Sequence, residues 1–307
     1  MPGSDSVTRR RFLSRALKIG ATGLAAPQVA GLAAQAAEPA RNAAWQIGCY
    51  TRPWDSHDYR VALDAIAEAG FKYAGLMTTK SETRLVISTA TTPEEAGRIG
   101  EEVKKRGLQI ASVYGGEFPV DRSLQAGIDG LRKLIDNCAA AGAPSLLLGG
   151  TGDTKLYEPY YKAVAECCDY AAGKRVALAL KPHGGLNATG PQCRKAIEQV
   201  GHRNFRLWYD PGNIRYYSDG KLNPVDDAAT VDGLVTGMCV KDYKDPKNVM
   251  VTPGAGQVNF GVVLARLKQG GFAQGPLVIE TLEAGELPKL LEQARKAREF
   301  VEGLTHP

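Results

Sequence analysis

Long apolar runs and a large excess of charge are both missing from this chain of 307 residues. Beyond residue 36 there is no stretch of about 20 apolar residues, which argues against a helix that spans a membrane. The formal net charge is +5, and residues 1–36 alone contribute +4 of it through five Lys/Arg and one Asp. The remainder is nearly neutral, which argues against nucleic acid or an anionic membrane surface as a stable partner.

A disulfide framework is also missing, although the chain has six cysteines. Cys167 and Cys168 are adjacent within a helical pattern, and Cys49 and Cys239 lie inside apolar runs. These positions are typical of buried thiols that fill space, and only the presence of one disulfide is left open.

The glycine fingerprint of dinucleotide-binding folds is a third absence, because no G-x-G-x-x-G follows the first apolar run. This argues against a doubly wound open sheet. What the chain does have is eight short apolar runs, at 46–50, 73–77, 109–113, 145–148, 176–180, 206–209, 234–240 and 277–280. Helical patterns lie between them, including Tyr59–Ala69, Thr92–Lys105, Ser123–Ala140 and Tyr157–Ala172. Eight β/α units over about 260 residues predict one α/β domain, a (β/α)8 TIM barrel.

The N-terminal segment is interpreted as an export signal. The stretch Thr8-Arg9-Arg10-Arg11-Phe12-Leu13 resembles the twin-arginine motif, and an Ala/Gly-rich stretch leads to an A-x-A cleavage site at residues 34–36. We therefore expect a signal peptide at 1–36, passage through the twin-arginine translocase and a periplasmic or otherwise exported location. The barrel then covers 41–307. The alternative is a short amphipathic helix of the mature fold.

Chemistry in a TIM barrel is located at the C-terminal ends of the strands. In the second half of the chain these ends carry most of the ionisable groups: Lys181, His183, Asp210, Lys241, Asp242 and Glu280. A carboxylate such as Glu280, at the end of an otherwise apolar strand, needs a partner or a ligand. We expect Lys241 and Asp242 to contact substrate, or else to pair with each other.

The strand ends in the first half of the chain are more aromatic, and they supply candidates for substrate binding. Trp54 could stack on the apolar face of a sugar, and Arg52 could hold a carboxylate, phosphate or hydroxyl group. Tyr114 and Glu117 follow the third strand and are placed in the same group. Packing within the loops is the alternative role for all four residues.

Several motifs of the second half resemble the xylose-isomerase-like barrel superfamily, which contains sugar-phosphate isomerases and epimerases. They are "YDPGN" after the sixth strand, "VKDYKD" after the seventh, "GAGQVNF" opening the last helix and "GPLVIET" at the eighth strand. The resemblance covers roughly residues 45–304 and implies a carbohydrate substrate. Four histidines are too few for the three-zinc endonuclease branch of this superfamily.

The resemblance also implies one divalent metal, held by residues at four strand ends. Asp210 and Glu280 match two of those positions, and His183 is a further candidate ligand. The other two positions hold Lys181 and Cys239, where the family has Glu and His. This departure weakens the case for a metal.

The favoured function is a sugar isomerase or epimerase that abstracts a proton next to a carbonyl group. Such chemistry needs a base, an acid and a group that stabilises the enediolate. We assign the base to Glu280 and the other two roles to Lys181 and His183, while Asp210 orders Lys181 or binds a metal. The alternatives are a lyase or hydrolase of oxidised (keto) glycosides, and a sugar-binding barrel without catalysis.

Lys181 is the most unusual of these residues, because lysine is seldom buried at the end of a core strand. The hypothesis is that its ammonium lies between Asp210 and Glu280 in place of a metal. The alternative is a structural salt bridge under a metal held by His183, Asp210 and Glu280.

Overall fold

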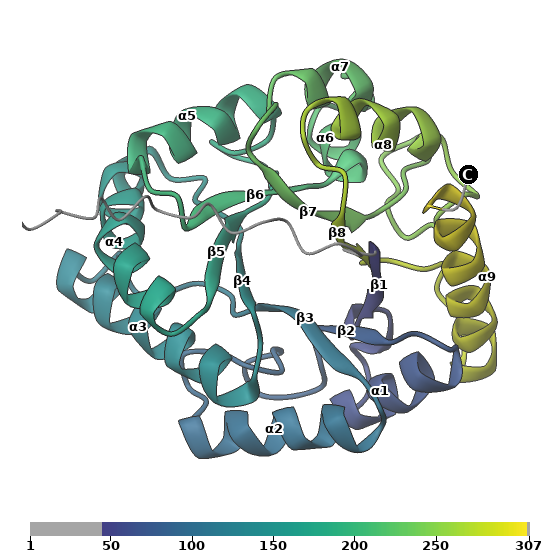
Figure 1. Cartoon of the computed structure of the whole chain (residues 1–307), viewed down its shortest axis with the longest axis horizontal. Helices are drawn as coiled ribbons and strands as arrows, with labels where there is room; N and C mark the ends of the chain where they lie inside the picture. Colours follow the sequence, from purple (N-terminus) through teal and green to yellow (C-terminus); the bar gives the residue numbers. More distant parts are fainter. Residues whose placement is uncertain (1–44, 306–307) are drawn as a thin grey trace, which may run out of the picture. The chain divides into compact units, whose positions relative to one another are not determined.

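The computed structural model describes residues 45–305, so the predicted signal segment at 1–36 lies outside the described residues. Within this range eight parallel strands form a closed barrel in chain order, and helices surround it (Figure 1). The strands are β1 (Trp45–Tyr50), β2 (Tyr73–Leu76), β3 (Gln109–Tyr114), β4 (Ser145–Leu148), β5 (Ala177–Leu180), β6 (Phe205–Tyr209), β7 (Val235–Val240) and β8 (Gly275–Ile279). The predicted TIM barrel is confirmed.

A short 3₁₀ helix, η1 (Arg52–Trp54), follows β1, and α-helices occupy the connections between later strands. The helices are α1 (Tyr59–Glu68), α2 (Pro93–Lys105), α3 (Leu124–Ala141), α4 (Thr154–Gly173), α5 (Gly190–Val200), α6 (Pro211–Tyr217), α7 (Pro224–Ala229), α8 (Phe260–Gln269) and α9 (Leu287–Thr305). The eight predicted strands differ from the observed ones by at most two residues at an end. One placement was wrong: "GAGQVNF" leads into α8, and α9 is the last helix described.

Local sequence signals explain where several of the helices begin and end. At α2 the Thr92 side chain accepts the backbone N–H of Glu95, and the Glu95 side chain accepts that of Thr92, which is a complete capping box. At the end of α3, Gly142 has φ 77°, a left-handed conformation that glycine adopts without steric cost. These ends fix the lengths of the helices and hence the positions of the loops.

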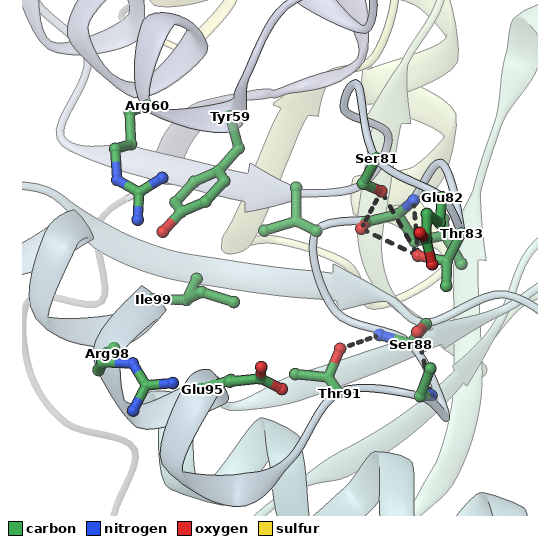
Figure 2. Close-up of a pocket in the computed structure, with 13 residues that line it drawn as sticks. Tyr59, Arg60, Ser81, Glu82, Thr83, Ser88, Thr91, Glu95, Arg98 and Ile99 are labelled. Atoms are coloured by element: carbon green, nitrogen blue, oxygen red, sulfur yellow. Dashed lines mark hydrogen bonds between the residues drawn. The ribbon is translucent and has the colours of Figure 1, made fainter.

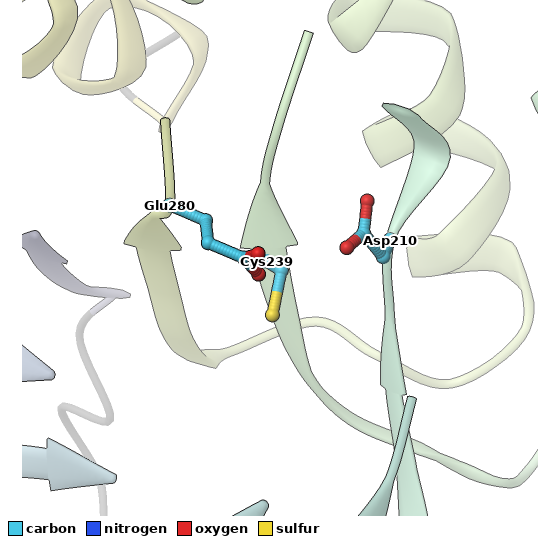
Figure 3. A group of neighbouring side chains, drawn as sticks. All are labelled: Asp210, Cys239 and Glu280. Carbon is cyan, nitrogen blue, oxygen red and sulfur yellow. The ribbon is translucent and has the colours of Figure 1, made fainter. Parts of the chain in front are cut away.

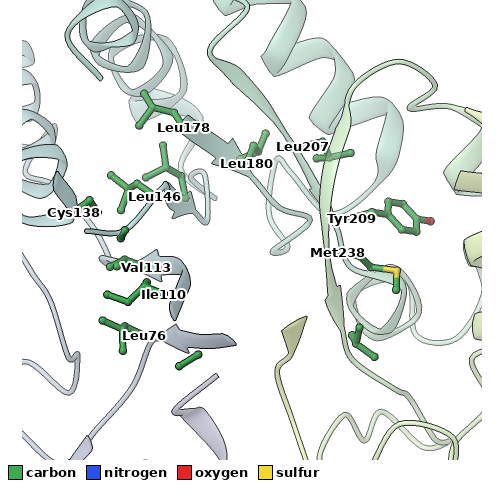
Figure 4. Close-up of a cluster of buried hydrophobic side chains, with 14 of the residues drawn as sticks. Leu76, Ile110, Val113, Cys138, Leu146, Leu178, Leu180, Leu207, Tyr209 and Met238 are labelled. Atoms are coloured by element: carbon green, nitrogen blue, oxygen red, sulfur yellow. The ribbon is translucent and has the colours of Figure 1, made fainter. Parts of the chain in front are cut away.

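The core has two layers, because alternate side chains of each strand face opposite sides of the sheet. The outer layer lies between strands and helices and includes Leu76, Ile110, Val113, Leu178 and Leu180 (Figure 4). The inner layer fills the barrel with Tyr50, Met77, Ala111, Leu147, Ala179, Trp208, Cys239 and Val278.

This alternation determines which residues enter the barrel mouth. Ala179, Trp208, Cys239 and Val278 face inward, so the residues two positions further along the chain point inward again. Those residues are Lys181, Asp210, Lys241 and Glu280. Within the described range, no helix is both long and apolar enough to cross a membrane.

Candidate active site

The centre of the barrel mouth is a group of five charged side chains, which we call the ion cluster. Its members are Arg52, Lys181, Asp210, Lys241 and Glu280. Apart from Arg52, whose side chain is 30% exposed, none is more than 2% exposed. Three cations and two carboxylates leave the ion cluster with a net charge of +1.

Lys181 lies between the two carboxylates, the position that the sequence hypothesis gave it. Its Nζ donates to Glu280 Oε2 and is 3.2 Å from Asp210 Oδ2. An ammonium group has three N–H donors, and these two carboxylate contacts account for two of them. At least one N–H donor of Lys181 is therefore not used by these carboxylate contacts.

Lys241 is a second buried ammonium in the same place, and its contacts show that it belongs to the ion cluster. Its Nζ is 2.5 Å from Glu280 Oε1, 3.4 Å from Asp210 Oδ2 and 3.0 Å from Asn213 Oδ1. Arg52 Nη1 also lies 2.5 Å from Glu280 Oε1. Glu280 is thus shared by three cations, and both of its oxygens are paired.

The charges in the ion cluster shift the ionisation of its members. Burial by itself would raise the pKa of Glu280, but Lys181, Lys241 and Arg52 outweigh it and hold that pKa well below its usual value. Burial would lower the pKa of Lys181, yet Glu280 and Asp210 raise it overall. The pKa of Lys241 is lowered, because its burial and the repulsion by Lys181 and Arg52 exceed the attraction of the carboxylates. The two lysines therefore differ in how firmly they hold a proton.

Asp210 is positioned by the helix that it caps. Its Oδ1 accepts the backbone N–H of Asn213 at 2.9 Å, at the start of α6. The other oxygen, Oδ2, faces the two lysines without an aligned hydrogen bond. Asn213 contacts Lys241 and also donates to Pro182 O at 2.7 Å, which ties the loops after β5 and β6 together. The sequence analysis missed Asn213, although it is the last residue of the Asp-Pro-Gly-Asn motif.

A cavity of about 340 Å³ lies between the loops after β3, β4 and β5. His183 and Glu117 line it together with glycines from 149–152 and 184–185. A side chain at Gly185 would place its Cβ only 2.4 Å from Gly152 Cα, and φ at Gly185 is 54°. The two loops can therefore approach this closely only because Gly185 lacks a side chain.

His183 is one of three titratable residues that line this cavity, together with Glu117 and Asp153. Its imidazole lies between the rings of Tyr114 and Tyr217, with centroid distances of 6.0 and 6.1 Å. Desolvation by the cavity walls and the positive charge of Lys181 lower the pKa of His183 to about 3, so that the imidazole is neutral at pH 7. Desolvation also raises the pKa of Glu117. The sequence analysis missed Tyr217, which lies at the end of α6 and carries no motif.

Two predicted substrate contacts were wrong. Trp54 is 1% exposed and belongs to the apolar layer outside the barrel, so it presents no face for stacking on a sugar. Asp242 points away from the mouth, because it follows the inward-facing Lys241 by one position. Both of its carboxylate oxygens accept backbone N–H groups within the loop that leads to α8.

The donor atoms of Asp210, Cys239 and Glu280 lie within 4.8 Å of one another, which is the spacing of a metal-binding group (Figure 3). The residues present nevertheless do not fit a divalent metal. Lys181 and Lys241 already occupy the carboxylate oxygens, and burial raises the pKa of the Cys239 thiol, which keeps it protonated. At an effective dielectric constant of about 20, a divalent ion about 5 Å from one ammonium is repelled by roughly 6–7 kcal/mol.

A larger cavity of about 470 Å³ lies on the outer side of the barrel, between α1, α2 and the loop after β2 (Figure 2). Hydroxyl groups and two arginines, Arg60 and Arg98, line it. Arg60 is already paired with Asp58 at 3.2 Å. None of the predicted site residues lines this cavity, so it is separate from the site at the barrel mouth.

The fold and the charged mouth define a TIM barrel with a polar site at the C-terminal ends of its strands, and comparison with known families identifies its family. The profile described as "Xylose isomerase-like TIM barrel" matches residues 63–304, and the chain belongs to this family. The resemblance found in the sequence motifs is thereby confirmed. None of the curated proteins matches the chain in sequence at a significant level.

Solved structures share the fold at low sequence identity. A xylose isomerase domain protein from Planctomyces limnophilus is 20% identical with a TM-score of 0.66, covering 85% of this chain and 97% of that one. A D-psicose 3-epimerase, determined in the presence of D-fructose, is 13% identical with a TM-score of 0.67, covering 85% and 99%. A D-allulose 3-epimerase from Methylomonas sp., in complex with D-allulose, is 17% identical with a TM-score of 0.67, covering 85% and 98%.

Proposed function

We propose that this protein is an enzyme that isomerises or epimerises a sugar or sugar derivative by proton transfer at a carbon next to a carbonyl group. The observation that carries the proposal is the ion cluster at the barrel mouth, where Lys181 keeps an ammonium N–H donor that its carboxylate contacts do not use. Fixed cations at such a position stabilise the negative charge that develops on the oxygen of an enediolate. The net charge of +1 favours the same anion.

The roles of the residues follow from their charges and from the ion pairs that they form. Lys181 stabilises the oxyanion, and Arg52, which is partly exposed, binds a hydroxyl or acidic group of the substrate. The sequence hypothesis assigned the base to Glu280, but both of its oxygens are ion-paired with cations. We therefore assign the proton acceptor to the neutral imidazole of His183, and we assign Glu280 the role of holding the three cations together.

In the reaction, His183 takes the proton from the carbon beside the carbonyl, and the electron pair moves to the oxygen near Lys181. Delivery of a solvent-derived proton to the opposite face of the same carbon, with the proton on His183 released to solvent, gives an epimer. Returning the proton on His183 to the former carbonyl carbon, with a second proton moving between the oxygens, gives an isomer. The family and the sugars in the related epimerase structures support a carbohydrate substrate.

The experiment that tests this proposal measures the exchange of carbon-bound hydrogen between the sugar and the solvent. The purified protein is incubated with a panel of keto- and aldo-sugars in D₂O, and carbon-bound deuterium is measured by NMR and mass spectrometry. We expect one deuterium per turnover next to the carbonyl carbon. Binding without any exchange would refute the proposal in favour of a sugar-binding barrel, and release of a leaving group from a keto-glycoside would favour a lyase or hydrolase.

We also propose that the protein acts outside the cytoplasm. The support is the Arg9-Arg10 motif and the A-x-A site at residues 34–36. A substrate met there is expected to be a free or oxidised sugar rather than a phosphorylated one.

A further inference from the structure

The barrel mouth combines two kinds of groups that compete for the same space. Asp210, Cys239 and Glu280 are buried, and their donor atoms lie within 4.8 Å of one another, as ligands of one ion would. The two carboxylates among them are also the counter-ions of Lys181 and Lys241. An ion and two ammonium groups cannot occupy this space together.

The contacts show which atoms are already used. Lys181 takes Glu280 Oε2, and Lys241 lies 2.5 Å from Glu280 Oε1. Both ammonium groups face Asp210 Oδ2, at 3.2 and 3.4 Å. A divalent ion would need these same oxygens, and it would raise the charge of a group that is already net positive.

We propose that this barrel mouth is a metal-independent site, in which the ammonium groups of Lys181 and Lys241 take the place of a divalent cation between Asp210 and Glu280. The two lysines supply two positive charges at fixed points, which equals the charge of one divalent ion. They also supply N–H donors, which a metal lacks, so that a substrate oxygen would be bound by a hydrogen bond rather than by coordination. The inference concerns the composition of the site and does not depend on the reaction proposed above.

The competing arrangement is an ion held by His183, Asp210 and Glu280 above a structural lysine. It would place the ion on carboxylate oxygens that Lys181 and Lys241 already contact, and each lysine is at most 2% exposed. Displacing either ammonium group to admit the ion would leave a buried charge without its partner, which is strongly unfavourable.

The first test measures metal in the wild-type protein. The protein is purified without chelator from cells supplied with Mn²⁺, Co²⁺ and Zn²⁺, and its metal content is measured by mass spectrometry. We then titrate it with Mn²⁺ and follow binding by electron paramagnetic resonance. We expect less than about 0.1 ion per chain and no saturable site at micromolar Mn²⁺. About one divalent ion per chain, or a saturable micromolar site, would overturn the proposal.

The second test changes one charge so that the ion cluster should bind a divalent ion. Lys181→Glu leaves three carboxylates facing two cations, so the ion cluster becomes attractive to a divalent ion. We expect Mn²⁺ to bind this variant at one site, at least about tenfold more tightly than the wild type. Lys221→Glu, which makes the same charge change on an exposed loop, is the matched control and should gain no such site.

A Lys181→Glu variant that folds, as judged by circular dichroism and gel filtration, and gains no Mn²⁺ site would contradict the role given to the Lys181 charge. If the variant does not fold, the wild-type measurement decides alone. The test is separate from that of the proposed function. A metal-free protein without isomerase or epimerase activity would refute the function only, and an active protein with one bound ion would refute this inference only.

Discussion

Lys181 and Lys241 carry the same ammonium group, yet their surroundings move their pKa values in opposite directions. The difference arises because the carboxylates prevail at Lys181, whereas burial and the neighbouring cations prevail at Lys241. A pair of like groups with separated pKa values is typical of sites that bind charge or move protons. The roles of individual residues can therefore be tested by changing one charge at a time.

Glu280→Gln removes the negative charge that three cations share and turns one of its two acceptor oxygens into an N–H₂ donor, while nearly preserving the shape of the side chain. We expect kcat/KM to fall at least about 10²-fold, because Lys181 and Arg52 lose the partner that fixes their positions toward the oxyanion. Thermal unfolding should remain a single transition at a lower Tm, since breaking a buried ion pair is costly. Glu283→Gln, in an exposed pair with Lys289, is the control. Equal rates in both variants would remove Glu280 from the site.

His183→Gln tests the proposed proton acceptor and its ionisation together. Loss of the acceptor should lower kcat by about 10²–10⁴-fold and abolish deuterium exchange. Exchange that persists in this variant would return the role of base to Glu280. The free energy of unfolding of this variant, measured at several pH values, tests the ionisation of His183.

The lowered pKa of His183 determines in which direction the stability of the folded protein changes with pH. The pKa of His183 is about 3 in the folded protein, against an ordinary value of about 6.5, so the unfolded chain binds more protons between these values. The contribution of His183 to stability is therefore complete above about pH 6.5 and is lost as the pH falls toward 3. Urea unfolding at several pH values should show the wild type losing stability faster than His183→Gln below pH 6.5. Parallel curves would show that the imidazole is not shielded from protonation.

At the scale of the elements, strand alternation explains both the successes and the errors of the sequence analysis. Lys181, Asp210 and Glu280 could be placed in the mouth because each lies two positions beyond an inward-facing strand residue. The same rule, applied at Lys241, sends Asp242 outward, and following it would have removed Asp242 from the substrate-binding group. Strand alternation does not predict the direction of the Trp54 side chain, because a 3₁₀ helix begins at Arg52 and interrupts the strand pattern.

The loop between β7 and α8 depends on Asp242. Its carboxylate accepts the backbone N–H groups of Tyr243, Gly254, Gly256 and Val258 at 2.8–3.0 Å. In Asp242→Asn one oxygen becomes an N–H₂ donor, so two of these N–H groups lose their acceptor. We expect the free energy of unfolding to fall by about 1–3 kcal/mol, measured by urea denaturation.

Asp219→Asn is the matched control for that measurement, since Asp219 forms an exposed pair with Lys247. Its effect should remain within about 0.5 kcal/mol. If Asp242→Asn is equally mild, the loop does not depend on this carboxylate.

For the whole molecule, the repeat of eight apolar runs predicted the barrel, because every run has to be buried on both faces. The site was predictable only as a set of strand ends. Which of those ends pair depends on contacts between distant segments, such as Lys241 with Asn213 and Glu280. Nor does periodicity reveal Tyr217, which reaches the mouth from the end of a short helix. The barrel architecture could therefore be predicted from the sequence, whereas the pairing of charges in the site could be seen only in the structure.

The Arg9-Arg10 motif near the N-terminus can be tested in cells. Replacing Arg9 and Arg10 together by Lys preserves the charge of the segment but removes the guanidinium pair of the twin-arginine motif. We expect this variant to remain in the cytoplasm as uncleaved precursor, whereas the wild type is cleaved near Ala36 and recovered in the exported fraction. Cell fractionation with immunoblotting and N-terminal sequencing measures both. The double change Arg15→Lys and Lys18→Arg, which alters neighbouring cations but leaves the pair intact, is the control and should be exported normally. Normal cleavage and export of the Arg9→Lys/Arg10→Lys variant would show that the segment is not a twin-arginine signal.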